Sequence, residues 1–430
     1  MDVSEARSSR RPPASRPLRL LAAGTIGNIL EWYDFALYGY LATVFADRFF
    51  PAADPTASLI GTYSVFAVGF LARPHGGMFF GRIGDQIGRR RLLRLSIILM
   101  GVSTFLMGVL PTYQSVGILA PVLLVALRIV QGISAGGEFS GSIVYLVEHA
   151  PARRRGLYGS VSNFGAMLGG LAGAAVAWAT TALLPEAALE SWGWRIPFLS
   201  GIVLAAAGLW LRSGIGESPV FEETRAAGDV VSRPVRAALK THPKEIVVTA
   251  LLNWAVSAGY YLVFVWLATD LHTYVGLSLP TALGLSSAGL LICSGLTVLA
   301  GSLADRIGPR AVLLITGLGV LFLSMPLFLL AGRGGAETAA LAQFGLAVLM
   351  AGYLGTLPAV FVSLHGSGIR CTSLSIGYNF ATAIFGGTAP LIATALVGAT
   401  GWQLAPGLYF AAAALLGLML LGFVPKRFEA

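Results

Sequence analysis

The chain has 430 residues and the composition of a membrane protein: 56% of them are hydrophobic, only 11% are charged, and the mean hydropathy is +0.76. Soluble domains carry about 25% charged residues, so a soluble enzyme or soluble binding domain is excluded. The net charge of +9 does not indicate nucleic-acid binding, because most Lys and Arg fall in loops on one side of the predicted spans, as the positive-inside rule requires.

Apolar runs of about 18 residues or more recur along the sequence and predict about twelve membrane helices. We therefore expect an all-α integral membrane protein. The predicted spans are 19–46, 57–80, 92–110, 117–146, 157–182, 194–213, 244–270, 281–300, 311–330, 338–363, 373–397 and 406–424.

The longest predicted cytoplasmic loop divides these helices into two groups of six. Ser218-Pro219, followed by Glu222, predicts a short helix near 218–227 within that loop. The position of the basic loops predicts that both termini are cytoplasmic, and we expect the membrane to be a bacterial-type inner (plasma) membrane. The expected units are a tail at 1–18, a six-helix bundle at 19–213, a linker at 214–243, a second six-helix bundle at 244–424 and a tail at 425–430.

The first predicted helix carries Asn28, Glu31 and Asp34, whose spacing places them on roughly one face. Glu31 lies about 12 residues from the cytoplasmic start, or ~18 Å along the helix, close to the middle of a ~30 Å hydrocarbon core. Carboxylates at this depth pair, face a cavity or carry protons. We expect at least one of the two acids to carry protons; the alternative is a structural ion pair or a buried hydrogen bond.

Arg73 lies near the cytoplasmic end of the second predicted helix and is a candidate substrate anchor, because its planar guanidinium suits a carboxylate. The alternative is an arginine bonded to backbone carbonyls freed by a helix break at Pro74. In the fourth helix, Arg128, Gln131 and Glu138 fall on one face. For Glu138 we expect a gate or a structural pair with a basic loop residue.

A polar loop pattern occurs twice, about half the chain apart. GRIGDQIGRRR begins at Gly81 and GSLADRIGPR begins at Gly301, each between two apolar runs. Such a recurrence implies two structurally equivalent halves. We interpret the two loops as a latch in which the acids cap neighbouring helices or pair with arginines on the inside face. The residues assigned to this gate are Gly81, Asp85, Arg89, Arg90, Glu138, Gly301, Asp305 and Arg310.

The second half has no charge at mid-depth in the helices that carry its polar residues. The seventh and eleventh predicted helices offer groups that can hydrogen-bond a small solute or stack on a cation, although ordinary packing is an equally good explanation for any one of them. The candidate substrate-binding residues of both halves are Asn28, Arg73, Gln131, Asn253, Tyr260, Tyr261, Tyr378 and Asn379.

Over residues 19–424 the chain resembles the major facilitator superfamily. The segments GNILEWYDF (27–35), FLARPHGG (70–77), RIVQGISAGGE (128–138), WGWRIPF (192–198) and ESPVFEE (217–223) are similar to its metabolite–proton symporter branch. That branch contains transporters for α-ketoglutarate, citrate, shikimate, and proline or betaine. The resemblance implies the major facilitator fold, alternating access, and coupling of Arg128 to the proton-carrying acid, Glu31 or Asp34.

We therefore expect a proton-coupled importer of a small polar metabolite that works as a monomer in the lipid bilayer, without cofactor, metal or nucleic acid. The buried arginines favour an organic carboxylate as substrate. The alternatives are a zwitterion such as proline or betaine, then a proton-antiporting exporter, then a non-transporting nutrient sensor. The sequence contains no phosphate-binding loop and no nucleophile elbow, so neither ATP-driven transport nor an enzyme is expected.

Overall fold

The computed structural model describes residues 17–51, 55–214, 216–400, 402 and 404–428. The expected N-terminal tail lies almost entirely outside these residues. Within the described part of the chain all regular structure is helical, which confirms the predicted class. Ten stretches of it are long and apolar enough to cross a membrane, and α1 and α3 complete the twelve that the sequence predicts.

The first half runs from α1 to α10. Its elements are α1 (Pro17–Tyr40), α2 (Ala42–Phe49), α3 (Pro55–Gln86), α4 (Arg89–Val109), α5 (Tyr113–Val116), α6 (Leu119–Glu148), α7 (Arg155–Leu183), α8 (Glu186–Ala188), the π-helical turn η2 (Leu189–Gly193), α9 (Arg195–Leu199) and α10 (Gly201–Ser213). The single span predicted at 19–46 is two helices, because the backbone of Leu41 leaves the α-helical region between α1 and α2.

The linker and the second half follow. The linker contains α11 (Pro219–Ala226), the short helix predicted there, and α12 (Pro234–Thr241). The second half contains α13 (Pro243–Tyr261), the π-helical segment η3 (Leu262–Trp266), α14 (Leu267–Thr273), α15 (Leu279–Ile307), α16 (Pro309–Ala331), α17 (Ala336–Leu364), the 3₁₀ turn η4 (Ser367–Ile369), α18 (Arg370–Ala381), the π-helical segment η5 (Thr382–Gly386), α19 (Gly387–Thr400), α20 (Ala405–Met419) and the 3₁₀ turn η6 (Leu420–Phe423).

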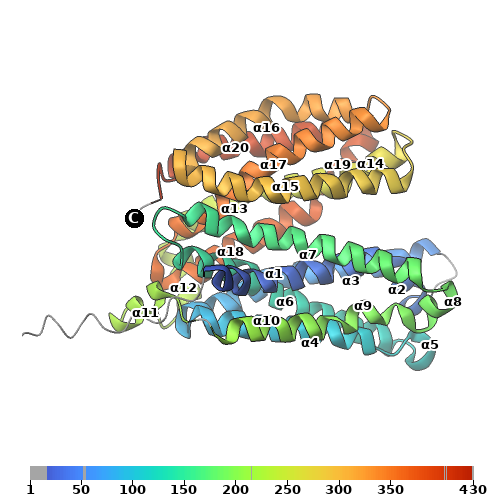
Figure 1. The fold of residues 1–430 in the computed structure, drawn as a ribbon, viewed down its shortest axis with the longest axis horizontal. Coiled ribbons are helices and arrows are strands. Elements are labelled where there is room, and N and C mark those ends of the chain that lie inside the picture. Colours follow the sequence, from blue (N-terminus) through green and yellow to red (C-terminus); the bar gives the residue numbers. More distant parts are fainter. Residues whose placement is uncertain (1–16, 52–54, 215, 401, 403, 429–430) are drawn as a thin grey trace, which may run out of the picture.

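The two halves lie side by side, with α11 and α12 at one end of the molecule (Figure 1). We call this end the linker end. Across the boundary between the halves, α3 packs against α18 and α15 packs against α7. These are equivalent pairs, because α3 and α15 carry the two copies of the repeated loop pattern.

A glycine seam joins α3 to α6 and so positions the charged residues of both helices. A Cβ atom built on Gly76 would lie 2.0 Å from the carbonyl oxygen of Ile133, and one on Gly136 would lie 2.2 Å from that of Arg73. Side chains of any size would separate the helices, which is why small residues mark close crossings in membranes. The seam therefore holds Arg73 and Arg128 on adjoining backbones.

We expect Gly76→Ala to destabilise the protein by about 1–3 kcal/mol, because overpacking forces the backbone to shift. Gly295→Ala on α15 is the matched control, since a Cβ there meets nothing within 4 Å; it should stabilise by roughly 0.5–1 kcal/mol through helix propensity. Thermal unfolding of the purified variants in detergent measures both. Equal melting temperatures for the two variants would contradict the seam.

Candidate functional site

The first buried ion pair of the site joins α1 to α6. Arg128 Nη1 lies 3.0 Å from Asp34 Oδ2, and both side chains are fully buried. The other oxygen of Asp34 accepts hydrogen bonds from the Thr104 hydroxyl (2.9 Å) and the Gln131 amide (2.8 Å). The guanidinium of Arg128 also lies 4.3 Å from the ring centre of Tyr38. Asp34 is thus held by three side chains from two other helices.

The second ion pair lies one helical turn away on α1. Arg73 Nη1 of α3 lies 2.8 Å from Glu31 Oε1, and neither side chain is more than 2% exposed. The helix-break alternative for Arg73 is wrong: α3 continues through Pro74. The two acids, which we expected to act as one group from their spacing, therefore belong to two separate ion pairs, Glu31 with Arg73 and Asp34 with Arg128.

These pairs leave the middle of the first half electrically neutral. Two acids and two arginines cancel, and each charge has a partner of opposite sign, which buried charges require. Asn28, the third polar residue on this face, instead donates hydrogen bonds to the Ser142 hydroxyl (2.9 Å) and to the Ser162 carbonyl (3.1 Å). Asn28 ties α1 to α6 and α7 and does not line the cavities described next.

A cavity of about 410 Å³ lies between the halves, toward the end opposite the linker. Its lining comes from α1, α3 and α7 of the first half and from α13–α15 with η3 of the second. The described lining residues include no charged side chain. Eight of them are aromatic: Trp32, Phe35, Tyr40, Phe66, Phe70, Tyr260, Tyr261 and Phe264. An aromatic cavity of this kind accommodates apolar and cationic groups.

A second, much smaller chamber of about 30 Å³ lies beyond an aromatic layer. Trp32, Tyr260 and Tyr261 line both spaces. Trp32 meets Tyr260 edge-on at 5.3 Å between ring centres, and Phe70 meets Tyr261 at 6.1 Å, so both contacts cross from one half to the other. The small chamber has room for about two water molecules, so a solute in the large cavity cannot pass this layer without movement of the halves.

Of the remaining predicted binding residues of the second half, one lines the small chamber and the two asparagines hydrogen-bond within the protein. Tyr378 lines it. Asn253 donates hydrogen bonds to the Tyr378 carbonyl (3.2 Å) and to the Thr382 hydroxyl (3.0 Å), which joins α13 to α18 and η5. Asn379 donates across the boundary to the Gly136 carbonyl of α6 at 2.8 Å. Tyr260 and Tyr261 are thus the predicted second-half residues that face the large cavity.

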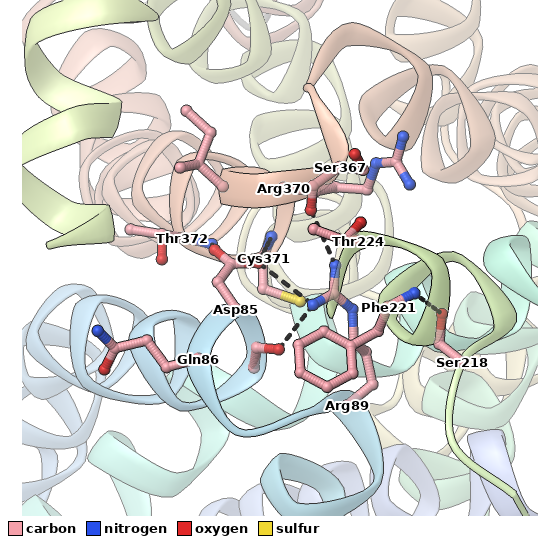
Figure 2. Close-up of polar contacts among 12 residues, drawn as sticks. Asp85, Gln86, Arg89, Ser218, Phe221, Thr224, Ser367, Arg370, Cys371 and Thr372 are labelled. Atoms are coloured by element: carbon pink, nitrogen blue, oxygen red, sulfur yellow. Dashed lines mark hydrogen bonds and ion pairs between the residues drawn. The ribbon is translucent and has the colours of Figure 1, made fainter. Parts of the chain in front are cut away.

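At the linker end, the two repeated acids cap helices of the opposite half. Asp85 accepts hydrogen bonds from the backbone N–H groups of Cys371 (3.1 Å) and Thr372 (2.8 Å) at the start of α18. Figure 2 shows Asp85 facing this turn, with Arg89 beside it at 3.5 Å. Asp305 accepts from the N–H groups of Gly156 (2.7 Å) and Leu157 (2.9 Å) at the start of α7.

The glycines that open each copy of the pattern permit this capping. A Cβ on Gly81 would lie 2.7 Å from the Cα of Thr372, and one on Gly301 would lie 2.6 Å from the carbonyl oxygen of Gly156. Each helix therefore approaches its partner's first turn closely enough for the aspartate to reach two N–H groups. Helix N-termini favour negative charge, so both contacts are charge-assisted.

The arginines of the pattern have different surroundings. Arg89 pairs with Glu148 (3.1 Å) and donates to the Ser367 carbonyl of the second half (3.2 Å). The main-chain N–H of Arg90 donates to Glu217 of the linker at 3.2 Å. Arg310 does not join the gate in this state, because it donates to the Val424 carbonyl (2.6 Å) within its own half.

Glu148 is a residue between the two halves that the sequence did not point out. It lies at the end of α6 and binds Arg89 of the first half and Arg370 (2.8 Å) of the second, so it bridges them directly. The Ser218 hydroxyl at the start of α11 also donates to it. Its signal in the sequence was an acid closing a long apolar run, next to His149.

The expectation for Glu138 was partly wrong. Its partner is Arg212, in the last turn of α10, rather than a loop residue. The two charges are buried and 2.5 Å apart, and the Ser96 hydroxyl donates to the same carboxylate. Arg212 also donates to the Ala23 carbonyl at 2.9 Å. The pair ties together four helices of the first half and makes no described contact with the second.

His365 lies between α17 and α18, beside the gate. Burial, together with the nearby Arg370 and His242, lowers the pKa of His365 to about 3. Its Nε2 atom lies 2.9 Å from the Thr249 hydroxyl. The imidazole therefore stays neutral at physiological pH, which argues against a proton-carrying role.

Two six-helix halves that are closed at one end, polar at the centre and hollow toward the other end have the build of a secondary transporter. A sequence profile described as Major Facilitator Superfamily matches residues 24–376. The chain belongs to the major facilitator superfamily, and it is a multi-pass membrane transporter of that type.

Individual proteins of known description are also similar to this chain. A putative proline/betaine transporter of Staphylococcus aureus (strain COL) is 35% identical over 418 residues, covering 96% of this chain and 89% of that protein. The glycine betaine/proline/ectoine/pipecolic acid transporter OusA of Dickeya dadantii (strain 3937) is 33% identical over 419 residues, covering 93% and 82%. Among solved structures, the proton:xylose symporter XylE has a TM-score of 0.82 at 18% identity over 96% and 97% of the two chains, a likeness of fold alone.

We expect Glu138→Gln to destabilise the protein by about 3–5 kcal/mol, because it leaves Arg212 charged and unpaired in the membrane. The double variant Glu138→Gln/Arg212→Met should recover much of that loss, since no unpaired charge remains. Thermal unfolding in detergent of the two single variants and the double variant measures the coupling. Single variants as stable as the wild type would show that the pair does not hold the bundle together.

Proposed function

We propose that this chain is a proton-coupled importer of a small zwitterionic solute of the proline or betaine kind. Two observations support the substrate class. Three relatives that match over more than 90% of the chain are described as transporters of proline, betaine or ectoine, and the site at mid-membrane is neutral. The expected preference for an organic carboxylate rested on free arginines, but both arginines are paired with acids.

The net charge of the site is the observation that favours a zwitterion over an anion. An organic anion entering the neutral centre would add an uncompensated negative charge in a medium of low dielectric constant. A zwitterion adds none. An organic acid remains the second candidate, because protons taken up with it would cancel its charge.

For the coupling step we assign the proton to Asp34, with Arg128 as its partner. Protonation of Asp34 removes the ion pair and leaves the guanidinium beside the aromatic rings of Tyr38, Phe35 and Phe66. Cation–π contacts stabilise that charge in part. When Asp34 loses the proton again, it re-forms the ion pair with Arg128. We place the linker end and both termini in the cytoplasm, in a plasma membrane, and a monomer as the working unit.

Alternating access follows from the two ends of the molecule. The capping contacts of Asp85 and Asp305 hold the linker end closed, while the cavity of about 410 Å³ lies toward the other end. We assign this arrangement to the outward-facing state. Solute and proton would enter from outside, the halves would rock, and the latch would open toward the cytoplasm.

The test of the function is uptake by purified protein in liposomes with an inward gradient of one pH unit. With the membrane potential held at zero by equal K⁺ and valinomycin, coupling of one proton per solute concentrates the solute about tenfold, so betaine or proline should accumulate while the interior acidifies. Citrate and α-ketoglutarate are offered in parallel. Accumulation of either anion alone would overturn the zwitterion assignment, uptake without acidification would indicate a uniporter, and binding without accumulation a sensor.

Asp34→Asn should abolish accumulation and bring the concentration ratio to about one, because an amide cannot carry the proton. Exchange of labelled for unlabelled solute across the membrane should persist. Asp47→Asn is the control, because Asp47 is exposed on α2 and far from the pair. Normal accumulation by Asp34→Asn would contradict the coupling assignment.

Opening of the latch can be followed at Cys371, which is buried beside Asp85. In a Cys293→Ala background, Asp85→Ala should speed maleimide labelling of Cys371 roughly 2- to 30-fold, as expected for loss of a cap worth about 0.5–2 kcal/mol. Asp305→Ala, on the other interface, should do the same, whereas Asp47→Ala should not. Faster labelling with Asp85→Ala alone would mean local fraying and contradict a joint latch.

A further inference from the structure

The Glu31–Arg73 pair is incompletely bonded, unlike the Asp34–Arg128 pair. Asp34 has hydrogen-bond donors on both carboxylate oxygens. Neither oxygen of Glu31 has a hydrogen bond among the described residues, and the Nε and Nη2 atoms of Arg73 have no acceptor there. The contact between the two side chains is a single approach of 2.8 Å. Buried polar atoms without partners are costly, so this pair has unused capacity for a ligand.

Neither member of the pair lines a cavity, but residues in contact with Arg73 or next to Glu31 do. The guanidinium of Arg73 lies 5.8 Å from the ring centres of Phe35 and Phe70, which line the large cavity. Trp32, adjacent to Glu31 in the chain, lines both spaces. The indole N–H of Trp32 and the hydroxyl of Tyr261 are also buried without a described partner. Unused donors therefore gather where the aromatic layer separates the chambers.

The geometry points to an exchange of partners at this place. In the empty protein, Glu31 is the ion-pair partner of Arg73. When the zwitterionic solute binds, its carboxylate takes the place of Glu31 on Arg73. The released Glu31 carboxylate and the ring faces of Trp32 and Tyr260 then hold the cationic end of the solute. This inference rests on the proposed function and adds to it the binding mode that selects a zwitterion.

The exchange itself does not change the net charge of the Glu31–Arg73 site. One ion pair plus a zwitterion becomes two ion pairs, Arg73 with the solute carboxylate and Glu31 with the solute cation. The planar guanidinium gains a bidentate partner through nitrogens that are unused in the empty state. The aromatic faces suit a quaternary ammonium group, which has no N–H to donate. An anion or a cation alone would leave one of the two buried charges without a partner.

The experiment uses betaine and two near-isosteres that each keep one of its charges. In 3,3-dimethylbutanoate a carbon replaces the quaternary nitrogen, leaving the anion; in choline a hydroxymethyl group replaces the carboxylate, leaving the cation. Binding to purified full-length protein is measured by isothermal titration calorimetry. The wild type should bind betaine at least about tenfold more tightly than either isostere.

The variants should change the class of ligand. Glu31→Gln leaves Arg73 free and should tighten binding of 3,3-dimethylbutanoate about tenfold or more, and Arg73→Gln leaves Glu31 free and should do the same for choline. Glu138→Gln is the matched control, because it unpairs another buried arginine of the same half and should not change the ligand preference. Glu31→Gln and Arg73→Gln variants that lose betaine binding without these reciprocal gains would overturn the exchange.

A neutral double variant keeps the test decisive if either single variant fails to fold. Glu31→Gln/Arg73→Gln leaves no buried charge unpaired and should lose at least about tenfold in betaine affinity; unchanged affinity would show a purely structural pair and overturn the inference. A wild type that binds no zwitterion overturns the proposed substrate class instead. In that case, a gain of anion binding by Glu31→Gln would still support the exchange, and its absence would overturn it.

Discussion

The neutrality of charge inside the membrane is the constraint on which the rest of the structure depends. An unpaired ion in the hydrocarbon core costs several kcal/mol, so Glu31, Asp34 and Glu138 each have an arginine within 3.0 Å. Those pairs join α1 to α3, α1 to α6, and α6 to α10, and so the same contacts that neutralise charge also assemble the bundle. A change in protonation is therefore also a change in packing.

The contacts that join the halves at the linker end rely on a different interaction, in which carboxylates bind backbone N–H groups at helix starts. Asp85 of α3 binds the start of α18, and Asp305 of α15 binds the start of α7; the internal repeat relates the two contacts. Such contacts form only when the two halves are in register, because each carboxylate needs two N–H groups from the opposite half. They are directional, and they lie outside the aromatic core, so they can break without exposing it.

The sequence was sufficient for the class, the helices and the family, because apolar length, loop charge and the repeated pattern are local signals. It placed Glu31 near the middle of the membrane, and the repeated aspartates in a symmetrical relation. It could not assign Glu31 to Arg73 or Glu138 to Arg212, because partners on different helices depend on rotation and crossing angle. The cavity could not be predicted from the sequence either, because Trp32, Phe35 and Phe70 look like ordinary apolar helix positions until the two halves are assembled.

The two halves divide the work unequally, although the fold relates them by symmetry. The first half holds the paired charges, whereas the second contributes phenols, amides and aromatic faces around the same chambers. Two π-helical segments, η3 and η5, interrupt the helices that carry Tyr261 and Tyr378. Insertions of this kind often occur at functional sites because they rotate the following side chains. The three mid-membrane ion pairs all lie within the first half, so a rocking motion of one half against the other need not pull the two members of any pair apart.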